Sequence, residues 1–138
     1  MKRVAVLGLL AWLAGCGAEE PPQHALLVDA DGNVLMTLEL AIADTEYERQ
    51  EGLRLHGPLA LGEGLLMTFP SETRVCITNA GVPFSIDILF LSTAGQVIGA
   101  ERGIPANAPG PYCNPAQQVL ELQGDSLPPL NQAKLELF

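Results

Sequence analysis

One stretch of six residues constrains the fold more than any other part of this chain. Between Ile86 and Leu91 every residue except Asp87 is apolar. Strands with one wetted face alternate apolar and polar residues, whereas near-continuous apolar runs are typical of strands covered on both faces. The run therefore predicts a central strand in a sheet that is covered on both sides.

A β-hairpin is expected earlier in the chain. Apolar residues recur at every second position within Asn33–Ile42, which indicates a strand with one buried face. Ala25–Val28 precedes it, and an Asp-Ala-Asp-Gly turn at residues 29–32 joins the two. An EF-hand loop needs a glycine at its sixth position and a glutamate at its twelfth, and neither is present. The segment therefore predicts a hairpin and not a calcium site.

One short helix and several more strands complete the predicted fold. Asp44 is a good N-cap for a helix that runs to about Leu53. Gly103–Pro115 contains four prolines, which exclude it from any central strand and predict a long irregular loop. Further strands are expected at Leu65–Phe69, ended by Pro70, and at Gln96–Ala100, Gln118–Leu122 and Ala133–Phe138. The predicted fold class is mainly β (α+β): a compact antiparallel sheet or small barrel-like fold with one short helix.

The N-terminus carries the pattern of a secretory signal. Lys2 and Arg3 precede an apolar run, Val4–Leu13, that is too short to span a bilayer as a helix. Two small residues then precede Cys16, an order that resembles the lipobox of bacterial lipoproteins. The resemblance implies cleavage after Gly15 and acylation of Cys16. The alternative is an ordinary signal peptide that happens to contain a cysteine.

These features divide the chain into three parts. Residues 1–15 are expected to be a lipoprotein signal peptide, residues 16–23 a polar tether, and residues 24–138 a single strand-rich domain. About 120 residues remain after cleavage, enough for one modest core and too few for two domains. Gly17 follows the cysteine, which by similarity to sorted lipoproteins implies the outer membrane. We therefore expect an outer-membrane lipoprotein in the cell envelope, facing the periplasm and held by its lipid.

Cys76 and Cys113 are the two cysteines in the body of the chain. In an oxidising envelope compartment they are expected to form a disulfide. Closing a loop of about 36 residues would stabilise the fold by roughly 3 to 4 kcal/mol in the chain-entropy model. The alternative is a reactive thiol or metal pair, but there is no CxxC spacing, and the histidines, His24 and His56, supply no nearby third ligand.

The charge of the chain is strongly acidic. Seven basic and sixteen acidic residues give a net charge of −9, and loss of Lys2 and Arg3 would make it −11. Such a surface repels nucleic acid and anionic lipid headgroups. We therefore expect no nucleic-acid partner, and any attachment to a membrane must come from the lipid.

Four segments together resemble a known family. They are similar to its motifs R-x-x-G-L-M, E-G-M-L-F-x-F, F-P-I-D-V-x-F-L and V-L-E-x-x-x-G, and lie at Arg49–Leu53, Glu63–Phe69, Phe84–Leu91 and Val119–Gly124. They cover about residues 45–125 and resemble the family known as domain of unknown function 192, small bacterial and archaeal proteins. The resemblance implies a compact strand-rich fold and an envelope setting, but no established reaction.

The chain also departs from the family pattern. Arg54 stands where methionine is usual, and Ile77–Val82 replaces a W-M-K-N-T or V-H-T-x-x-M segment, of which Asn79 alone matches. Ser126–Pro129 replaces the glycine turns that precede the family's last strand. If the family binds a ligand through the segment that Ile77–Val82 replaces, these departures imply that this chain binds it weakly or binds something else.

Asp87 is the best candidate for acid–base catalysis, because a carboxyl group inside an apolar strand can be poised for proton transfer. The sequence favours a structural role for it, in which Asp87 accepts hydrogen bonds from backbone N–H groups or from an arginine such as Arg74 or Arg102. No nucleophile elbow and no phosphate-binding loop is present, which argues against a serine hydrolase or a nucleotide-binding enzyme.

The sequence therefore favours a binding module over an enzyme. Because recognition concentrates in irregular segments around a rigid sheet, we expect the binding surface around Thr78–Pro83, Gly57–Gly64 and the proline-rich loop. The candidate functional residues are Thr78, Asn79, Asp87 and Tyr112. No metal or cofactor is expected. Two alternatives are a small envelope enzyme that uses Asp87, and an accessory lipoprotein that binds another envelope protein.

Overall fold

The structure is a computed structural model, and it describes residues 21–138. The expected signal peptide, the lipidation site Cys16 and most of the tether lie outside the described residues. Seven strands form one sheet in the order β5-β4-β6-β3-β2-β1-β7. The elements are β1 Gln23–Val28, β2 Val34–Ala43, α1 Glu46–Glu51, η1 Gly52–Leu55, β3 Glu63–Ile77, β4 Ile86–Leu91, β5 Val97–Ile104, β6 Tyr112–Gln123 and β7 Lys134–Leu137.

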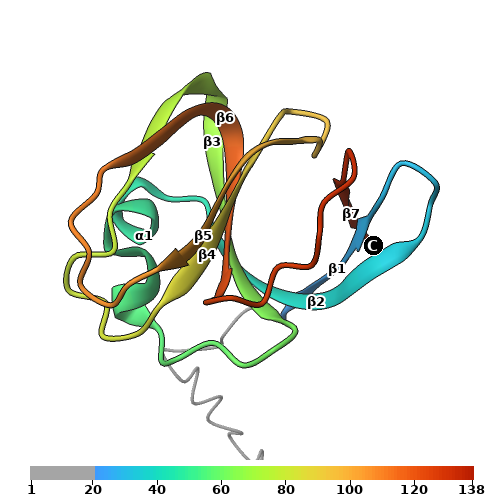
Figure 1. The fold of residues 1–138 in the computed structure, drawn as a ribbon. Coiled ribbons are helices and arrows are strands. Elements are labelled where there is room, and N and C mark those ends of the chain that lie inside the picture. Colours follow the sequence, from blue (N-terminus) through green and yellow to red (C-terminus); the bar gives the residue numbers. More distant parts are fainter. Residues whose placement is uncertain (1–20) are drawn as a thin grey trace, which may run out of the picture.

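The sheet curls into a half-barrel (Figure 1), which confirms the predicted fold class. Neighbouring strands are antiparallel except β2 and β3, which run parallel because the α1–η1 segment carries the chain back between them. The two edges approach at one end, where Gln96 forms an isolated bridge with Lys134 of β7. The expected hairpin is present as β1 and β2.

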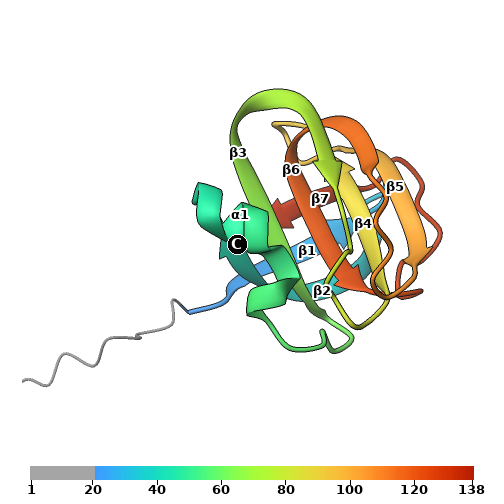
Figure 2. The same cartoon turned by 90° about the vertical axis from the view of Figure 1, so that its left-hand side faces the viewer.

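Strand β4 lies between two apolar cores, as the apolar run predicts. All of its residues are buried. Ile86, Ile88 and Phe90 belong to the core on the α1 side of the sheet. Leu89 and Leu91 belong to the core enclosed by the curl, on the side of β7. Figure 2 shows α1 beside β3, outside the curl of the sheet.

The two cores are built from the described part of the chain. The core on the α1 side spans Ala43 to Val119, and the enclosed core spans Ala25 to Leu135. Every core residue among residues 21–138 therefore lies between Ala25 and Leu135. Within residues 21–138, no helix has the length and apolar character needed to cross a membrane.

The helix begins one residue later than predicted. Thr45, and not Asp44, is the N-cap of α1: its side chain accepts a hydrogen bond from the backbone N–H of Glu48. The Glu48 carboxylate accepts one in return from the N–H of Thr45. Only Thr45 has a glutamate three residues later that can complete this capping box. The 3₁₀ helix η1 follows α1 directly, from Gly52 to Leu55.

Two predictions based on proline were wrong. Strand β3 does not end at Pro70 but continues to Ile77 through an irregularity between Thr68 and Thr73. The loop expected over residues 103–115 is shorter, since β6 begins at Tyr112 and includes Pro115. β6 pairs with β4 only from Gln118 onward, so Pro115 lies where β6 has β3 as its one strand neighbour. A missing N–H is tolerated at such a position.

The two cysteines meet across this outer part of the sheet. Cys76 of β3 is the direct pairing partner of Cys113 of β6, and their sulfur atoms lie 2.16 Å apart, at bonding distance. Cys113 therefore lies in a strand and not in the predicted loop. The disulfide joins β3 and β6 in the region where neither strand pairs with β2 or β4.

We predict that the double variant Cys76→Ser, Cys113→Ser loses about 3 to 4 kcal/mol of unfolding free energy, because the bond closes a long loop in the unfolded chain. Urea unfolding of residues 17–138 with and without reductant measures this. The reduced wild type should match the variant, and the variant should not respond to reductant. A loss below about 1 kcal/mol would contradict the prediction.

Candidate functional site

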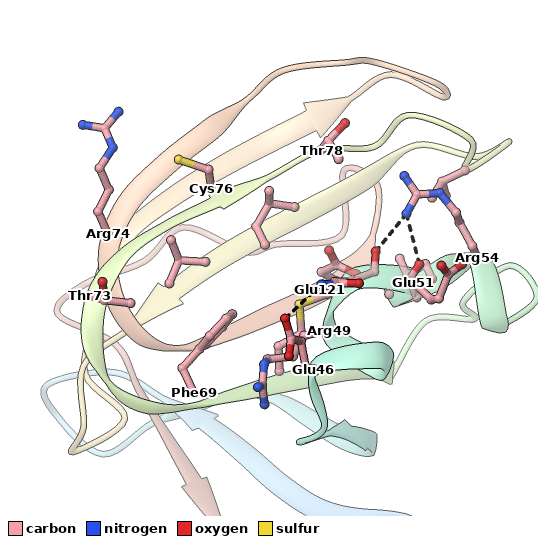
Figure 3. A pocket seen from close by; sticks show the side chains of 17 residues that line it. Glu46, Arg49, Glu51, Arg54, Phe69, Thr73, Arg74, Cys76, Thr78 and Glu121 are labelled. Atoms are coloured by element: carbon pink, nitrogen blue, oxygen red, sulfur yellow. Dashed lines mark hydrogen bonds between the residues drawn. The ribbon is translucent and has the colours of Figure 1, made fainter.

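A pocket with a volume of about 450 Å³ opens between the α1–η1 segment and β3 (Figure 3). This volume is within the usual range for small-molecule sites, about 300 to 1,000 Å³. The walls combine apolar side chains with charged and polar ones, and charged side chains from the helix face β3 across the opening. The apolar residues are Leu53, Met67, Phe69, Val75, Ile77 and Val82; the charged ones are Glu46, Arg49, Glu51, Arg54, Arg74 and Glu121.

One wall of the pocket is the free edge of β3. Residues 73–78 all border it in succession. Since side chains of a strand alternate between faces, an unbroken run of lining residues means that the strand's edge itself faces the pocket. β2 pairs with β3 only as far as Met67, so this edge has no neighbouring strand among the described residues. The α1–η1 segment stands opposite.

Glu121 of β6 forms the buried polar part of the pocket. Its side chain is 3% exposed, and its Oε2 atom has no hydrogen-bond partner among the described residues. Burial raises the pKa of the Glu121 carboxyl to about 7, against the opposing influence of the Arg54 charge. Keeping this buried carboxyl group ionised costs free energy, because no N–H or O–H group of the described residues donates a hydrogen bond to Oε2.

Gly52 lets the end of the helix come close to Glu121. Its φ of 52° lies in the left-handed region that favours glycine. A Cβ atom at this position would lie 3.1 Å from the Met67 Cε atom and 3.9 Å from the Glu121 Oε2 atom. A residue with a side chain at position 52 would be strained by the positive φ and would crowd the Met67 side chain near Glu121, so glycine suits this position.

Two arginines beside the pocket are held by backbone carbonyl groups. Arg49 donates to the carbonyl of Thr68 at 2.9 Å, and its guanidinium lies 5.3 Å from the centre of the Phe69 ring. Arg54 donates to the carbonyls of Gln50 and Glu51 and, across the pocket mouth, to that of Ala80. Arg54 therefore ties the helix end to the loop after β3. Arg74 extends outward from β3 in Figure 3.

The predicted functional residues do not form one cluster. Thr78 is exposed and lines the pocket. Asn79 is buried, and its amide donates to the carbonyls of Phe84 and Pro105, which fixes the loops together. Tyr112 is half-buried against the core on the α1 side, opposite Ile77, and does not line the pocket. The segment around Gly57 borders a second cavity, of about 710 Å³.

Asp87 lies in β4 on the face away from Glu121 and is fully buried. One carboxylate oxygen accepts hydrogen bonds from the N–H groups of Gly103 and Asp125, at 2.7 and 2.8 Å. The other accepts from those of Ser126 and Leu127, at 3.0 and 2.9 Å. Asp87 thus has the structural role that the sequence favoured, with backbone donors in place of an arginine. It lines neither the pocket nor the second cavity.

Sequence reasoning missed Glu121 as a site residue, although it belongs to the Val119–Gly124 segment, which shares the V-L-E start of a family motif. The available signal was the same one that drew attention to Asp87, a lone acidic residue between apolar neighbours in a strand. No group of three or more histidine, cysteine, aspartate or glutamate side chains suited to a metal ion occurs among residues 21–138. Glu121 is therefore a single buried carboxyl and not part of a ligand set.

The chain belongs to the DUF192 family, described as "Uncharacterized ACR", whose model matches residues 26–131. Its fold is similar to that of two solved structures. One is a putative transcription regulator from Sinorhizobium meliloti 1021, 20% identical, with a TM-score of 0.78 over 88% of this chain and 97% of that one. The other is a protein of unknown function from Novosphingobium aromaticivorans DSM 12444, 18% identical, with a TM-score of 0.71 over 82% and 83%. A search of curated proteins found no match.

We predict that Asp87→Asn lowers the unfolding free energy by about 3 kcal/mol or more. The amide group would face two N–H donors and lose two hydrogen bonds to a charged acceptor, each worth about 1.5 to 3 kcal/mol. Urea unfolding at pH 7 measures the loss. Asp31→Asn, in an exposed turn, is the matched control and should change stability by less than about 0.5 kcal/mol. Equal effects of the two changes would refute the structural role.

We predict a pH-dependent stability difference between Glu121→Gln and the wild type. The carboxyl group has a pKa of about 7 in the folded protein and an ordinary value near 4.5 when unfolded. The folded state therefore holds the proton more tightly, and the wild type loses stability as pH rises from about 4.5 to 7. Above pH 7 the buried, ionised Glu121 lowers the free energy of unfolding by about 3 kcal/mol, relative to its value at low pH. Glutamine carries no such cost.

Urea unfolding of both proteins between pH 5 and pH 8 tests this. Glu121→Gln should gain stability relative to the wild type across this range and reach its largest advantage at pH 8. A difference that stays constant with pH would show that Glu121 has an ordinary pKa.

Proposed function

We propose that this protein is a small-ligand binding module, anchored through a lipid on Cys16 to the outer membrane and facing the periplasm, with the pocket at Glu121 as its binding site. The observation that carries the proposal is the unpaired oxygen of Glu121 beside a pocket of about 450 Å³. Buried polar groups normally have partners, and an exception at the base of a cavity points to a ligand that supplies the partner.

The composition of the pocket supports the binding of a small ligand. Apolar walls such as Leu53, Val75 and Ile77 provide surface for an apolar ligand body, and a few polar groups can fix its orientation. The described tether residues Pro21 and Pro22 border the second cavity and not this pocket. The described end of the tether therefore meets the domain at the second cavity and not at the proposed site. Binding to another envelope protein stays a prediction.

A neutral probe, 1-hexanol, tests whether the pocket takes small amphiphiles. We expect binding to ¹⁵N-labelled residues 17–138 at millimolar or lower Kd, with NMR shift changes confined to α1, η1, β3 and β6. Thr73 is exposed and shares a face of β3 with Val75 and Ile77, so Thr73→Trp should fill the pocket mouth and weaken binding at least tenfold.

Thr37→Trp is the matched control, at an exposed position of β2 that lines neither cavity. It should leave the Kd unchanged within a factor of two. The proposal would be contradicted if 1-hexanol caused no shift changes, if the changes lay elsewhere, or if both tryptophan variants weakened binding equally.

A further inference from the structure

We infer that the pocket selects ligands carrying a protonated amine, which donates to the Glu121 carboxylate while the apolar part of the ligand lies against the pocket walls. This inference rests on the proposed function and names the chemical class of its ligand. Three features of the site support it: an acceptor without a donor, neighbouring arginines that are held by backbone carbonyl groups and make no hydrogen bond to this acceptor, and a charge distribution that favours a cation at the base of the pocket.

The first feature is the contrast between the two buried acidic side chains of the β4–β6 pair. Asp87 accepts hydrogen bonds from four backbone N–H groups. The Glu121 Oε2 atom accepts none from the described residues. An ionised carboxylate is an acceptor only, whereas an ammonium group has three donors and no acceptor. An ammonium group is therefore the direct chemical complement of Glu121.

The second feature is that the nearby arginines do not supply the missing donor. Arg54 is close enough for its charge to act on Glu121, yet its N–H groups donate to the carbonyls of Gln50, Glu51 and Ala80. Arg49 is similarly held by the carbonyls of Asp44 and Thr68. Both guanidinium groups are held by backbone carbonyl groups, and neither donates to the Glu121 Oε2 atom, so a ligand can supply that donor.

The third feature is the distribution of charge around the pocket. Acidic and basic groups are mixed at the opening: Glu46, Arg49, Glu51 and Arg54 come from the α1–η1 segment and Arg74 comes from β3. Glu121, by contrast, is the one charged group of β6 among the lining residues. A cationic group of a ligand is therefore attracted most strongly to the base of the pocket, where it meets the ionised Glu121. A carboxylate placed there would meet Glu121 in a poorly solvated site, where like charges repel strongly.

Proton linkage gives the site a further signature. Burial raises the pKa of Glu121 to about 7, and an ammonium group binds the ionised form. Affinity for an amine should therefore rise with pH through about 7 and level off above it. An alkylamine keeps its own charge over this range, because its pKa is close to that of lysine, about 10.4.

Three probes with the same six-carbon chain test the inference: n-hexylammonium chloride, 1-hexanol and sodium hexanoate, titrated into ¹⁵N-labelled residues 17–138 at pH 8. We expect hexylammonium to bind at least ten times more tightly than hexanol, and hexanoate to bind most weakly. Hexylammonium binding no more tightly than hexanol would overturn the inference and leave the proposed function standing. Failure of all three probes to bind would overturn both.

Glu121→Gln separates the role of the carboxylate from that of the pocket. The Glu121→Gln variant should weaken hexylammonium binding at least tenfold, because it removes the carboxylate, and should leave hexanol binding unchanged within a factor of two. The matched control is Glu101→Gln, at an exposed position of β5 that lines neither cavity, which should change hexylammonium binding less than threefold. In the wild type, hexylammonium should bind about tenfold more weakly at pH 6 than at pH 8, and this dependence should vanish in Glu121→Gln. Equal losses in the two glutamine variants, or a persisting pH dependence, would overturn the assignment.

Discussion

The β4–β6 pair carries a buried carboxyl group on each face, and the rest of the structure depends on how the two are accommodated. Asp87 of β4 lies opposite Leu122, and Glu121 of β6 lies opposite Ile88. Asp87 is fully buried and Glu121 is 3% exposed, so bulk water solvates neither carboxyl group well. Burying a carboxylate without partners costs several kcal/mol, so each group needs either donors or a raised pKa. The two positions meet this requirement in different ways.

Asp87 is fully provided with backbone donors. Its four hydrogen bonds connect β4 to Gly103 near the end of β5 and to residues 125–127 after β6. They fix the region where β4 begins, β5 and β6 end, and the chain turns toward β7. Glu121 has no comparable set, and its environment raises its pKa instead. The same sheet thus keeps one carboxylate for structure and leaves the other beside a pocket.

The sequence predicts the strands better than it predicts the site. Alternation in Asn33–Ile42 and the apolar run at Ile86–Leu91 identify β2 and β4, because side-chain burial follows local periodicity there. Prolines misled the prediction at residues 70 and 115, since proline is excluded only where a strand has neighbours on both sides, and the number of neighbours is a tertiary property. The parallel pairing of β2 with β3 is likewise absent from any local pattern.

The site escaped prediction for a related reason. Leu120 and Leu122 face the enclosed core, and Val119 and Glu121 face the other side, but the run Val-Leu-Glu-Leu gives no sign of which face borders a pocket. Gly52 and Arg54 approach Glu121 only through the crossover between β2 and β3. Thr78 is exposed and lines the pocket, whereas Asn79 and Asp87 hold the loops together. Local sequence identifies unusual residues, and the fold decides which of them border a cavity.

The most direct test of the account is the ionisation of Glu121 itself. ¹³C NMR of carboxyl-labelled glutamate in residues 17–138, with the resonance assigned by its absence in Glu121→Gln, would follow the group through a pH titration. The account predicts a midpoint of about 7, in keeping with a carboxyl group buried without a donor. A midpoint near the ordinary glutamate value of 4.5 would mean that Glu121 is solvated or paired, and would contradict the site described here.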